Sequence, residues 1–392
     1  MPATSVTEPP RVPRGLKGVQ VADTTIGDVR GLEGFYHYRQ YNAVEIAERL
    51  TFEDAWHLLI EGELPTPGQR DRFAAEVAGL RTLPDAVRRV LPVIAGAAAP
   101  GSLAALRSAL SVLAVAEQFR PSLDATPAEL RRDGLRMSAV TPTVNAALYR
   151  LGRGEEPIEP RSDLGHCANY LYMLTGEEAD PARVRAIEAY MTSTIEHGFN
   201  ASTFTARVVT STGADAGSAV VAALGSLSGP LHGGAPSRAL DTLDEIGTPD
   251  RAAGWIREAV SNGQRIMGFG HPVYKTDDPR SVLLRQIARQ FGGPLAEFAE
   301  QVEQITLDTL AELKPGQRIR TNVEFYAGVV MELSGLAREL FTPTFAASRV
   351  VGWCAHILEQ AADDRIIRPS ARYVGPAAPA PLPAYSRDSS AA

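Results

Sequence analysis

Residues 214–228 read Ala-Asp-Ala-Gly-Ser-Ala-Val-Val-Ala-Ala-Leu-Gly-Ser-Leu-Ser, a run of small and apolar side chains between Gly213 and Gly229. Because these residues are small or apolar nearly all round, they predict a helix that is buried on every side. We expect this helix to pack with its backbone close to a neighbouring element. Such a deeply buried helix is typical of a large, mainly helical body.

Helical spacing continues through much of the chain, whereas strand-like alternation is rare. Leucines at positions 103, 106, 110 and 113 fall on one helical face, and the same 3–4 spacing recurs across 302–313. Alternation is confined to short stretches such as Val19-Gln-Val21, which supports at most a small hairpin near the N-terminus. We therefore predict an all-α fold.

Length and charge narrow the class of protein. A chain of 392 residues exceeds the size at which single cores usually stop growing, so we expect two domains, or one large domain with a smaller companion. The net charge of −7 comes from dispersed acidic and basic residues, which argues against nucleic acid or a membrane as the main partner. Residues 1–14 lack the apolar run of a secretory signal, so we expect a cytoplasmic protein.

The cysteines and the two ends of the chain carry further expectations. Cys167 and Cys354 both lie in apolar helical surroundings, so buried free thiols are a better interpretation than a disulfide framework or a zinc cluster. Residues 1–14 and 376–392 are rich in Pro, Ala and Ser with few large apolar residues, and we expect them to be disordered.

Three glycine-punctuated segments carry histidines that a loop or helix end can direct into a cleft, namely His197, His232 and His271. Glycines around His232 leave the backbone open, so a bulky ligand could approach a neutral imidazole and accept a hydrogen bond from it. The alternative is a glycine-rich interdomain turn with a capping histidine. A lone histidine in such a segment is usually structural, which is our interpretation of His37, His57, His166 and His356.

Basic side chains gather after His271. The loop reads Gly268-Phe-Gly-His-Pro-Val-Tyr-Lys275 and continues to Asp278-Pro-Arg280. Histidine, lysine and arginine this close together could cradle carboxylates or phosphates, since arginine binds carboxylates bidentately. A solvated basic turn is the alternative.

Two more arginines stand out in apolar or proline-flanked surroundings. Arg349 lies within an apolar helical segment, and Arg368 precedes Pro369. An arginine on an apolar helix must find an anion or extend to water. A dicarboxylate ligand would explain both residues together with Arg280.

Glu324 lies in Thr-Asn-Val-Glu-Phe-Tyr, among apolar and aromatic neighbours. Desolvation there would raise its pKa toward the range of a general base. The alternative is a glutamate at the N-cap or in the first turn of the following helix, which would serve that helix only.

Taken together, these segments resemble the citrate synthase family from about residue 15 to residue 376. The motifs occur in family order: Glu196-His197 with Asn200-Ala-Ser-Thr203, Gly229-Pro-Leu-His-Gly-Gly234, Gly268 to Lys275 with Asp278-Pro-Arg280, Asn322-Val-Glu-Phe-Tyr326, Ser348-Arg349 with Gly352-Trp353, and Arg368-Pro369 followed by Tyr373-Val-Gly-Pro376. The resemblance implies condensation of acetyl-CoA with oxaloacetate and water to citrate, without a cofactor or a metal.

The resemblance also implies a homodimer of almost all-α subunits. Each subunit would have a large helical domain, residues 15–234 and 335–375, and a small, mobile, CoA-binding helical domain, residues 235–334. The small domain would close over the substrates.

By motif, three residues would carry the chemistry. His232 would hydrogen-bond the thioester carbonyl and stabilise the enol, Glu324 would take the methyl proton, and His271 would polarise the oxaloacetate carbonyl. The keto acid would be held by His197, Arg280, Arg349 and Arg368, the last contributed to the partner's site. Coenzyme A would lie near Gly268, Gly270, Val273, Tyr274 and Lys275.

One departure from the family pattern bears on activity, because the usual base is aspartate and this chain has Glu324. An extra methylene displaces the carboxylate, and misplacement near 1 Å can cost on the order of 10²-fold in rate. A 2-methylcitrate synthase using propionyl-CoA, a low-activity or non-catalytic homologue, and a zinc hydrolase with His232, His271 and Glu324 as ligands are the alternatives.

Overall fold

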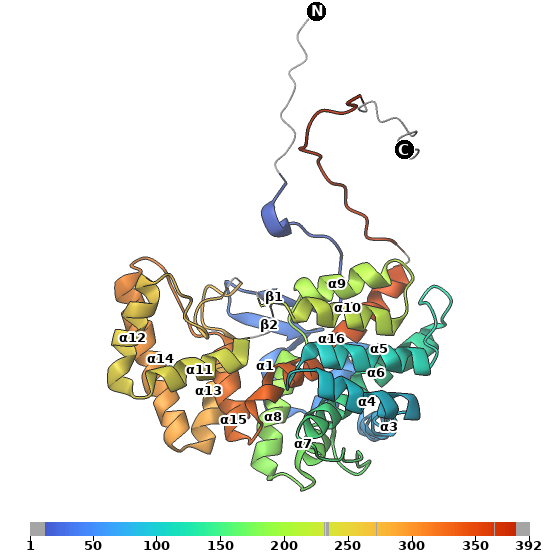
Figure 1. Ribbon diagram of the computed structural model, residues 1–392, viewed down its shortest axis with the longest axis horizontal. Coiled ribbons are helices and arrows are strands. Elements are labelled where there is room, and N and C mark those ends of the chain that lie inside the picture. The colour runs from blue at the N-terminus through green and yellow to red at the C-terminus, as the bar shows by residue number, and fades with distance from the viewer. Residues whose placement is uncertain (1–11, 231, 233–234, 272, 364, 382–392) are drawn as a thin grey trace, which may run out of the picture.

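The computed structural model describes residues 12–230, 232, 235–271, 273–363 and 365–381, which form a mainly helical protein (Figure 1). Its elements in chain order are η1 (Arg14–Leu16), β1 (Gly27–Arg30), β2 (Phe35–Tyr38), β3 (Tyr41–Asn42), α1 (Ala43–Arg49), α2 (Phe52–Glu61), α3 (Pro67–Gly79), α4 (Asp85–Ala97), α5 (Leu103–Ala116), α6 (Pro127–Gly152), α7 (His166–Thr175), α8 (Pro181–Thr194), α9 (Ala201–Thr210), α10 (Ala216–Leu227), α11 (Ala235–Ile246), α12 (Pro249–Ser261), α13 (Pro279–Phe291), α14 (Pro294–Leu313), α15 (Val323–Leu333), η2 (Arg338–Leu340) and α16 (Phe341–Asp363). The predicted all-α fold is confirmed.

The predicted disorder at the two ends concerns residues that mostly lie outside the described ranges. Of the C-terminal stretch, residues 376–381 are described, and they are exposed and form no helix or strand. The described parts of the two ends, residues 12–25 and 365–381, leave the body close to α9 in Figure 1.

The small sheet lies later in the chain than predicted. Val19 and Val21 are in no strand and are exposed by 42% and 36%, so the expected strand there is wrong. The strands β1, β2 and β3 instead pair antiparallel in that order. In β2 the alternate residues Tyr36 and Tyr38 are aromatic and point into the core. Their hydroxyls donate to Ser193 O and Thr192 O, at 3.0 and 2.8 Å.

The small-residue segment forms α10, which packs against α5, α6, α9 and α16. A methyl group added at Gly217 would come within 2.4 Å of Ala114 Cβ, so the predicted close approach of a neighbouring helix is confirmed. The prediction of burial on every side is wrong for the single chain. Ser218 is exposed and Val221, Ala222 and Gly225 are half-buried, which leaves one side of α10 uncovered.

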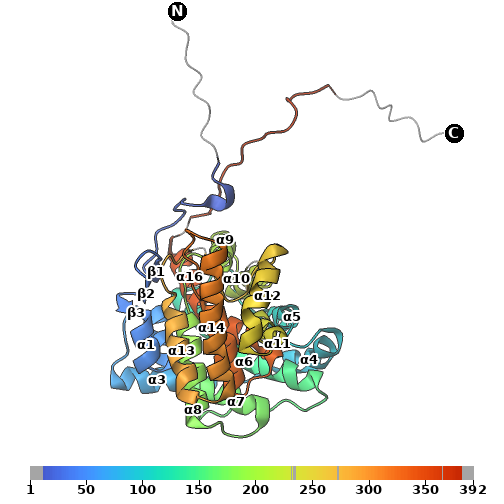
Figure 2. The ribbon, with the colours of Figure 1, turned by 90° about the vertical axis from the view of Figure 1, so that its left-hand side faces the viewer.

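The helices α11 to α14 gather on one side of the molecule, in yellow and orange in Figure 1, and α13 and α14 run side by side in Figure 2. A small apolar cluster there contains Ile256, Ala259, Ile266 and Leu310. A larger cluster is continuous from α2 and α8 into α11, α13, α14 and α15. The two groups of helices therefore share apolar contacts beside the site described below.

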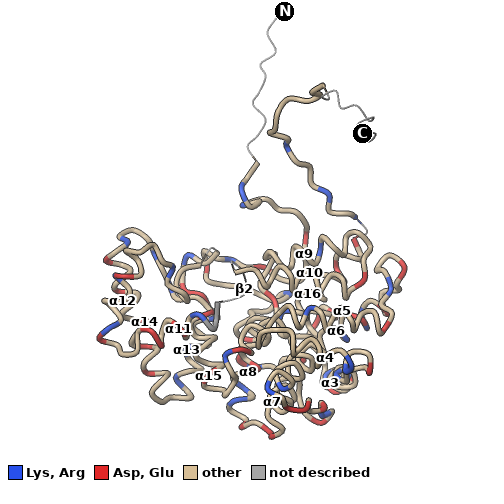
Figure 3. The backbone as a smooth tube through the Cα atoms, in the orientation of Figure 1, with Lys and Arg blue, Asp and Glu red and all other residues tan. Residues whose placement is uncertain are grey.

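The chemistry of the surface and of the thiols agrees with expectation. Acidic and basic residues are interspersed along the chain without a large block of one sign (Figure 3). Among the described residues, no helix has both the length and the apolar character needed to cross a membrane. Cys167 and Cys354 are buried and free, as predicted.

Candidate active site

The loop that carries His271 is fixed to the start of α15. Gly270 N donates to Arg320 O at 2.8 Å, and Asn322 donates from its backbone N to Gly268 O and from Nδ2 to Gly270 O, both at 2.9 Å. The φ angles of Gly268 and Gly270 are +83° and +84°, a left-handed conformation that favours glycine. The glycines are therefore needed to shape this loop.

The ring of His271 has a defined tautomer. Its Nδ1 accepts hydrogen bonds from the backbone N–H groups of Val273 and Tyr274, both at 3.0 Å. The proton of the neutral ring is therefore on Nε2. Burial lowers the pKa of His271 to about 4, and nearby Arg280 acts in the same direction. At neutral pH the ring is an uncharged Nε2–H donor.

His197 follows the end of α8 and lies beside that loop. Its Nε2 is 2.9 Å from the Tyr274 hydroxyl, and its ring centroid is 6.1 Å from that of His271. Burial lowers the pKa of His197 well below its usual value, helped by Arg280 and Arg349. This imidazole is also neutral, and it lies close to two guanidinium groups.

Arg280, in the first turn of α13, is buried against Asp278. Its Nη2 donates to Asp278 Oδ2 at 2.8 Å and its Nε to Oδ1 at 3.0 Å. Its Nη2 also lies 3.5 Å from Nε2 of His271. Since both of these nitrogens carry protons, the two N–H groups are placed to share an acceptor such as a ligand oxygen.

Asp278 also connects α13 to α15. It caps α13 by accepting from Arg280 N at 3.0 Å, and its Oδ2 accepts from Val323 N at 3.1 Å. Val323 is the first residue of α15, so one carboxylate joins the starts of both helices.

Glu324 lies in the first turn of α15, behind the N-cap Asn322, whose Oδ1 accepts from Glu324 N at 3.0 Å. Burial raises the pKa of Glu324 from its ordinary value of 4.5 to about 7, although the Arg280 charge opposes this shift. Glu324 is therefore desolvated, as predicted, and it also lies in the first turn of a helix, as the alternative interpretation had it. A carboxylate with this pKa can accept and release a proton near neutrality.

His232, which lies in the turn after α10, is joined to a polar network on α9 and α16. Its Nε2 is 2.8 Å from Ser202 Oγ, which also accepts from Trp353 Nε1 at 3.2 Å. The Ser202 hydroxyl donates to Asn200 Oδ1 at 2.7 Å, so Nε2 of His232 acts as the donor in this pair. Burial lowers the pKa of His232 to about 4, again with Arg349 acting in the same direction.

Arg349 lies in the middle of α16 and is 2% exposed. Its Nε donates to Thr194 O at 2.8 Å, and its guanidinium lies 4.8 Å from the centre of the Phe345 ring. Burial lowers the pKa of Arg349, whereas the nearby Glu196 carboxylate raises it. Among the described residues no hydrogen bond to Nη1 or Nη2 is present, so these donors can serve an anionic ligand.

The structure brings most of the predicted site residues into one region but leaves Arg368 apart. Arg368 lies in the exposed segment after α16, and among the described residues the last hydrogen bond from this segment to the body is Ile367 N to Ser211 Oγ at 3.0 Å. Val273 and Lys275 are exposed, whereas Tyr274 is 4% exposed and faces the histidines.

Sequence reasoning missed the supporting residues of the site. The Arg280 guanidinium carbon lies 6.0 Å from the centre of the Tyr36 ring on β2. His232 is held by Ser202, which in turn accepts a hydrogen bond from Trp353. Ser202 and Trp353 lie in motifs that the sequence singled out. The aromatic alternation across 35–38 was the available signal for Tyr36.

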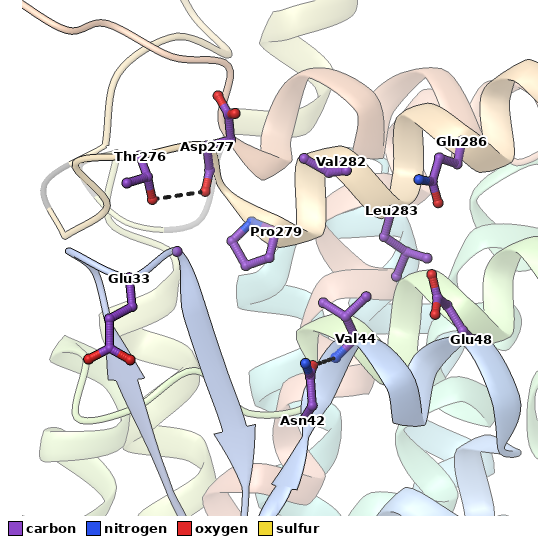
Figure 4. A pocket seen from close by; sticks show the side chains of 11 residues that line it. Glu33, Asn42, Val44, Glu48, Thr276, Asp277, Pro279, Val282, Leu283 and Gln286 are labelled. Carbon is purple, nitrogen blue, oxygen red and sulfur yellow. Dashed lines mark hydrogen bonds between the residues drawn. The ribbon is translucent and has the colours of Figure 1, made fainter.

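A cavity lies next to Asp278, since its lining includes Asp277 and Pro279. Its volume is about 470 Å³, and it is bounded by the turn after β1, by α1 and by α13 (Figure 4). Its lining includes Glu33, Glu48, Thr276, Asp277 and Gln286, and none of the predicted site residues. Among the described residues, no group of three or more His, Cys, Asp or Glu could hold a metal ion, so the zinc-ligand interpretation has no support in their placement.

Comparison with known proteins decides the family. The family model described as the C-terminal domain of citrate synthase matches residues 15–370. The chain belongs to the citrate synthase family. A citrate synthase of Deinococcus radiodurans is 37% identical over 369 residues, which covers 93% of this chain and 96% of that protein. One from Mycolicibacterium smegmatis is 38% identical over 383 residues, covering 96% and 98%.

Solved citrate synthase structures show the same fold. That of Thermoplasma acidophilum, a ternary complex with carboxymethyl coenzyme A and oxaloacetate, has a TM-score of 0.87 at 28% identity and covers 95% of this chain and 99% of that one. The Pyrobaculum aerophilum structure has a TM-score of 0.84 at 34% identity, covering 98% of each chain. The citrate synthase fold predicted from the motifs is confirmed.

Proposed function

We propose that this citrate synthase family member is an acyltransferase that condenses acetyl-CoA with oxaloacetate and water to give citrate and free CoA. The observation that carries the proposal is the clustering of two neutral histidines and Arg280 near Glu324, whose pKa is about 7. A base of this pKa suits removal of a carbon-bound proton, and uncharged N–H donors suit oxygens on which negative charge develops.

The first step forms the enol of acetyl-CoA. Glu324 takes a proton from the methyl carbon, the C–H electron pair becomes the carbon–carbon double bond, and the carbonyl π pair moves to the thioester oxygen, which shares the His232 Nδ1–H proton to give the enol. That role needs a donor on His232 Nδ1. The Ser202 hydroxyl must therefore turn its proton from Asn200 to Nε2 of His232, a rotation that its 2.8 Å separation from that nitrogen permits.

The second step joins the two substrates. The enol carbon attacks the keto carbon of oxaloacetate, and His271 Nε2–H gives its proton to the oxygen that becomes the hydroxyl. Water then cleaves the thioester, releasing citrate and the CoA thiol. The keto acid would be held by His197, Arg280 and Arg349. The neutral imidazole and the two cationic guanidinium groups lie close together near the His271 ring, so their N–H groups can donate to the same ligand.

We also propose that the active form is a homodimer in which Arg368 reaches the partner's site. Two features support this proposal. Arg368 lies on a segment that leaves the body of its own protomer, and α10 has an uncovered side of small residues suited to close helix packing. Residues 15–234 with 335–375 would form the large domain, and residues 235–334 the small domain.

Coenzyme A would bind mainly to the small domain, near Gly268, Gly270, Val273 and Lys275. Closure of this domain after oxaloacetate binds would complete the CoA site. We therefore expect acetyl-CoA to bind about 5- to 150-fold more tightly in the presence of oxaloacetate, as a coupling of about 1–3 kcal/mol gives. Calorimetry measures this, and equal affinities with and without oxaloacetate would contradict ordered binding.

The test of the proposed function is steady-state release of CoA by the purified protein with oxaloacetate and either acetyl-CoA or propionyl-CoA. We expect the higher kcat/KM with acetyl-CoA. One methylene is worth only about 1–3 kcal/mol in a pocket, so some activity with propionyl-CoA is compatible with the proposal. A higher kcat/KM with propionyl-CoA would make the chain a 2-methylcitrate synthase, and absence of CoA release would reject both.

A glycine outside the site gives a test of loop placement. Lys275 N donates to Gly31 O at 2.9 Å, and a methyl group at Gly31 would come within 2.3 Å of Val273 O. Gly31→Ala should therefore displace the loop that carries His271 and lower kcat by about 10-fold or more. The control is Gly96→Ala in α4, where a methyl group would meet nothing within 4 Å. Equal kcat for the two variants would show that this contact does not position the loop.

A further inference from the structure

Tyr274 is buried between the two neutral histidines of the site. It is 4% exposed, and its ring centre lies 4.7 Å from that of His271 and 5.6 Å from that of His197. The Arg280 guanidinium lies 5.8 Å from the same ring. The side chain thus contacts residues proposed to hold the keto acid, whereas its neighbours Val273 and Lys275 are exposed.

The hydroxyl of Tyr274 is placed to select the tautomer of His197. Burial raises the pKa of the Tyr274 hydroxyl, so the phenol keeps its proton at neutral pH. Within the described ranges, the only hydrogen-bond partner of this hydroxyl is His197 Nε2, at 2.9 Å. The protonated O–H group can donate to Nε2, and in that arrangement the proton of the neutral His197 ring is on Nδ1.

The backbone of the same residue sets the protonation of His271. The N–H of Tyr274 is one of the two donors to His271 Nδ1, at 3.0 Å, which leaves the proton on Nε2. One residue thus defines which nitrogen each histidine can present as a donor. The next residue anchors the loop, because Lys275 N donates to Gly31 O at 2.9 Å.

We infer that Tyr274 is a positioning residue for the keto acid and not a contact for coenzyme A. Its hydroxyl holds the His197 ring so that Nδ1–H is the donor offered to an oxygen of the bound dicarboxylate. Loss of the hydroxyl frees the ring to turn or to change tautomer, which weakens keto-acid binding and leaves the CoA contacts intact. This inference rests on the proposed function and assigns one further residue to it.

The test is Tyr274→Phe, which removes the hydroxyl and keeps the ring between the imidazoles. The matched control is Tyr170→Phe, since Tyr170 is also buried and its hydroxyl lies 2.9 Å from Thr344 Oγ1, outside the site. Steady-state kinetics gives KM for each substrate, calorimetry gives the oxaloacetate Kd, and thermal unfolding checks both variants.

We expect Tyr274→Phe to raise the oxaloacetate KM and Kd by about tenfold, because a buried polar group loses its partner. The KM for acetyl-CoA and kcat should stay within about threefold of wild type, and Tyr170→Phe should change neither KM. An oxaloacetate KM within twofold of wild type, or a rise confined to the KM for acetyl-CoA, would overturn the inference.

Two further outcomes have defined meanings. If Tyr274→Phe does not fold, Tyr274→Leu, which also lacks the hydroxyl, is measured in the same way and the same division between the two KM values is expected. Wild-type protein that releases no CoA would reject the proposed function, whereas active wild type with an unchanged Tyr274→Phe variant would reject only the role of Tyr274.

Discussion

Glu324→Gln is expected to lower kcat by about 10²-fold or more while leaving the oxaloacetate KM near that of wild type. Glutamine keeps the size of the side chain but cannot accept the methyl proton. In the wild type, kcat should fall as pH drops below about 7, because burial raises the pKa of Glu324 to about 7 and the protonated form is not a base. The pH dependence of kcat in both proteins measures this.

The same substitution is expected to stabilise the fold at alkaline pH. The pKa of Glu324 is about 7 in the folded state and near 4.5 when solvated, so burial disfavours its charged form. The resulting loss of stability is absent below pH 4.5 and complete above pH 7. Glu324→Gln should therefore raise the free energy of unfolding by about 1–3 kcal/mol at pH 8 and have no such effect at pH 4.

The control is Glu45→Gln, which also removes a first-turn glutamate from an Asn-capped helix but at an exposed position on α1. It should change neither kcat nor its pH dependence. Glu324→Asp tests the departure from the usual family base, because a backbone built for aspartate would give a higher kcat and one adapted to glutamate a lower kcat. Wild-type turnover in Glu324→Gln would exclude this residue as the base.

Arg349→Ala should lower kcat/KM for oxaloacetate by about 10²- to 10³-fold, the loss expected when one member of a buried charge pair is removed. The guanidinium is 2% exposed, and among the described residues only its Nε has a hydrogen bond, to Thr194 O. A dicarboxylate would therefore lose a cationic donor that water cannot replace in this buried position.

The loss should appear with the keto acid and not with the thioester. KM for acetyl-CoA at saturating oxaloacetate should change less than about threefold in Arg349→Ala. Arg132→Ala, at a position whose side chain is 61% exposed, is the control for removal of one positive charge. Oxaloacetate kinetics near wild type in Arg349→Ala would show that the keto acid binds elsewhere.

Much of the architecture could be predicted because it depends on local pattern. Helical spacing and the small-residue run predicted the helical body and the close approach at Gly217, which the structure confirms. The apolar neighbours of Glu324 predicted a raised pKa, and the structure agrees. The catalytic and binding roles of the site residues stay predictions.

What could not be predicted depends on contacts between distant segments. We expected a small hairpin near residues 19–21, whereas the strands β1 and β2 lie at 27–38. Their place depends on Tyr36 and Tyr38, whose hydroxyls donate to backbone oxygens at the end of α8, far along the chain. The environment of Tyr274 likewise depends on His197, which lies 77 positions away. The family resemblance of the Gly268–Lys275 motif had grouped Tyr274 with Val273 and Lys275 as residues near coenzyme A.

The double attachment of Asp278 has a consequence for how motion affects catalysis. Its carboxylate holds Arg280 and the first residue of α15, so thermal displacements of the anion-binding group and of the proposed base are correlated. Arg349 and Ser202, which supports His232, belong to α16 and α9 and are not held by this carboxylate. Any shift of α13 and α15 relative to α9 and α16 would therefore change the distance from Arg280 and Glu324 to Arg349 and His232 more than the distance between Arg280 and Glu324.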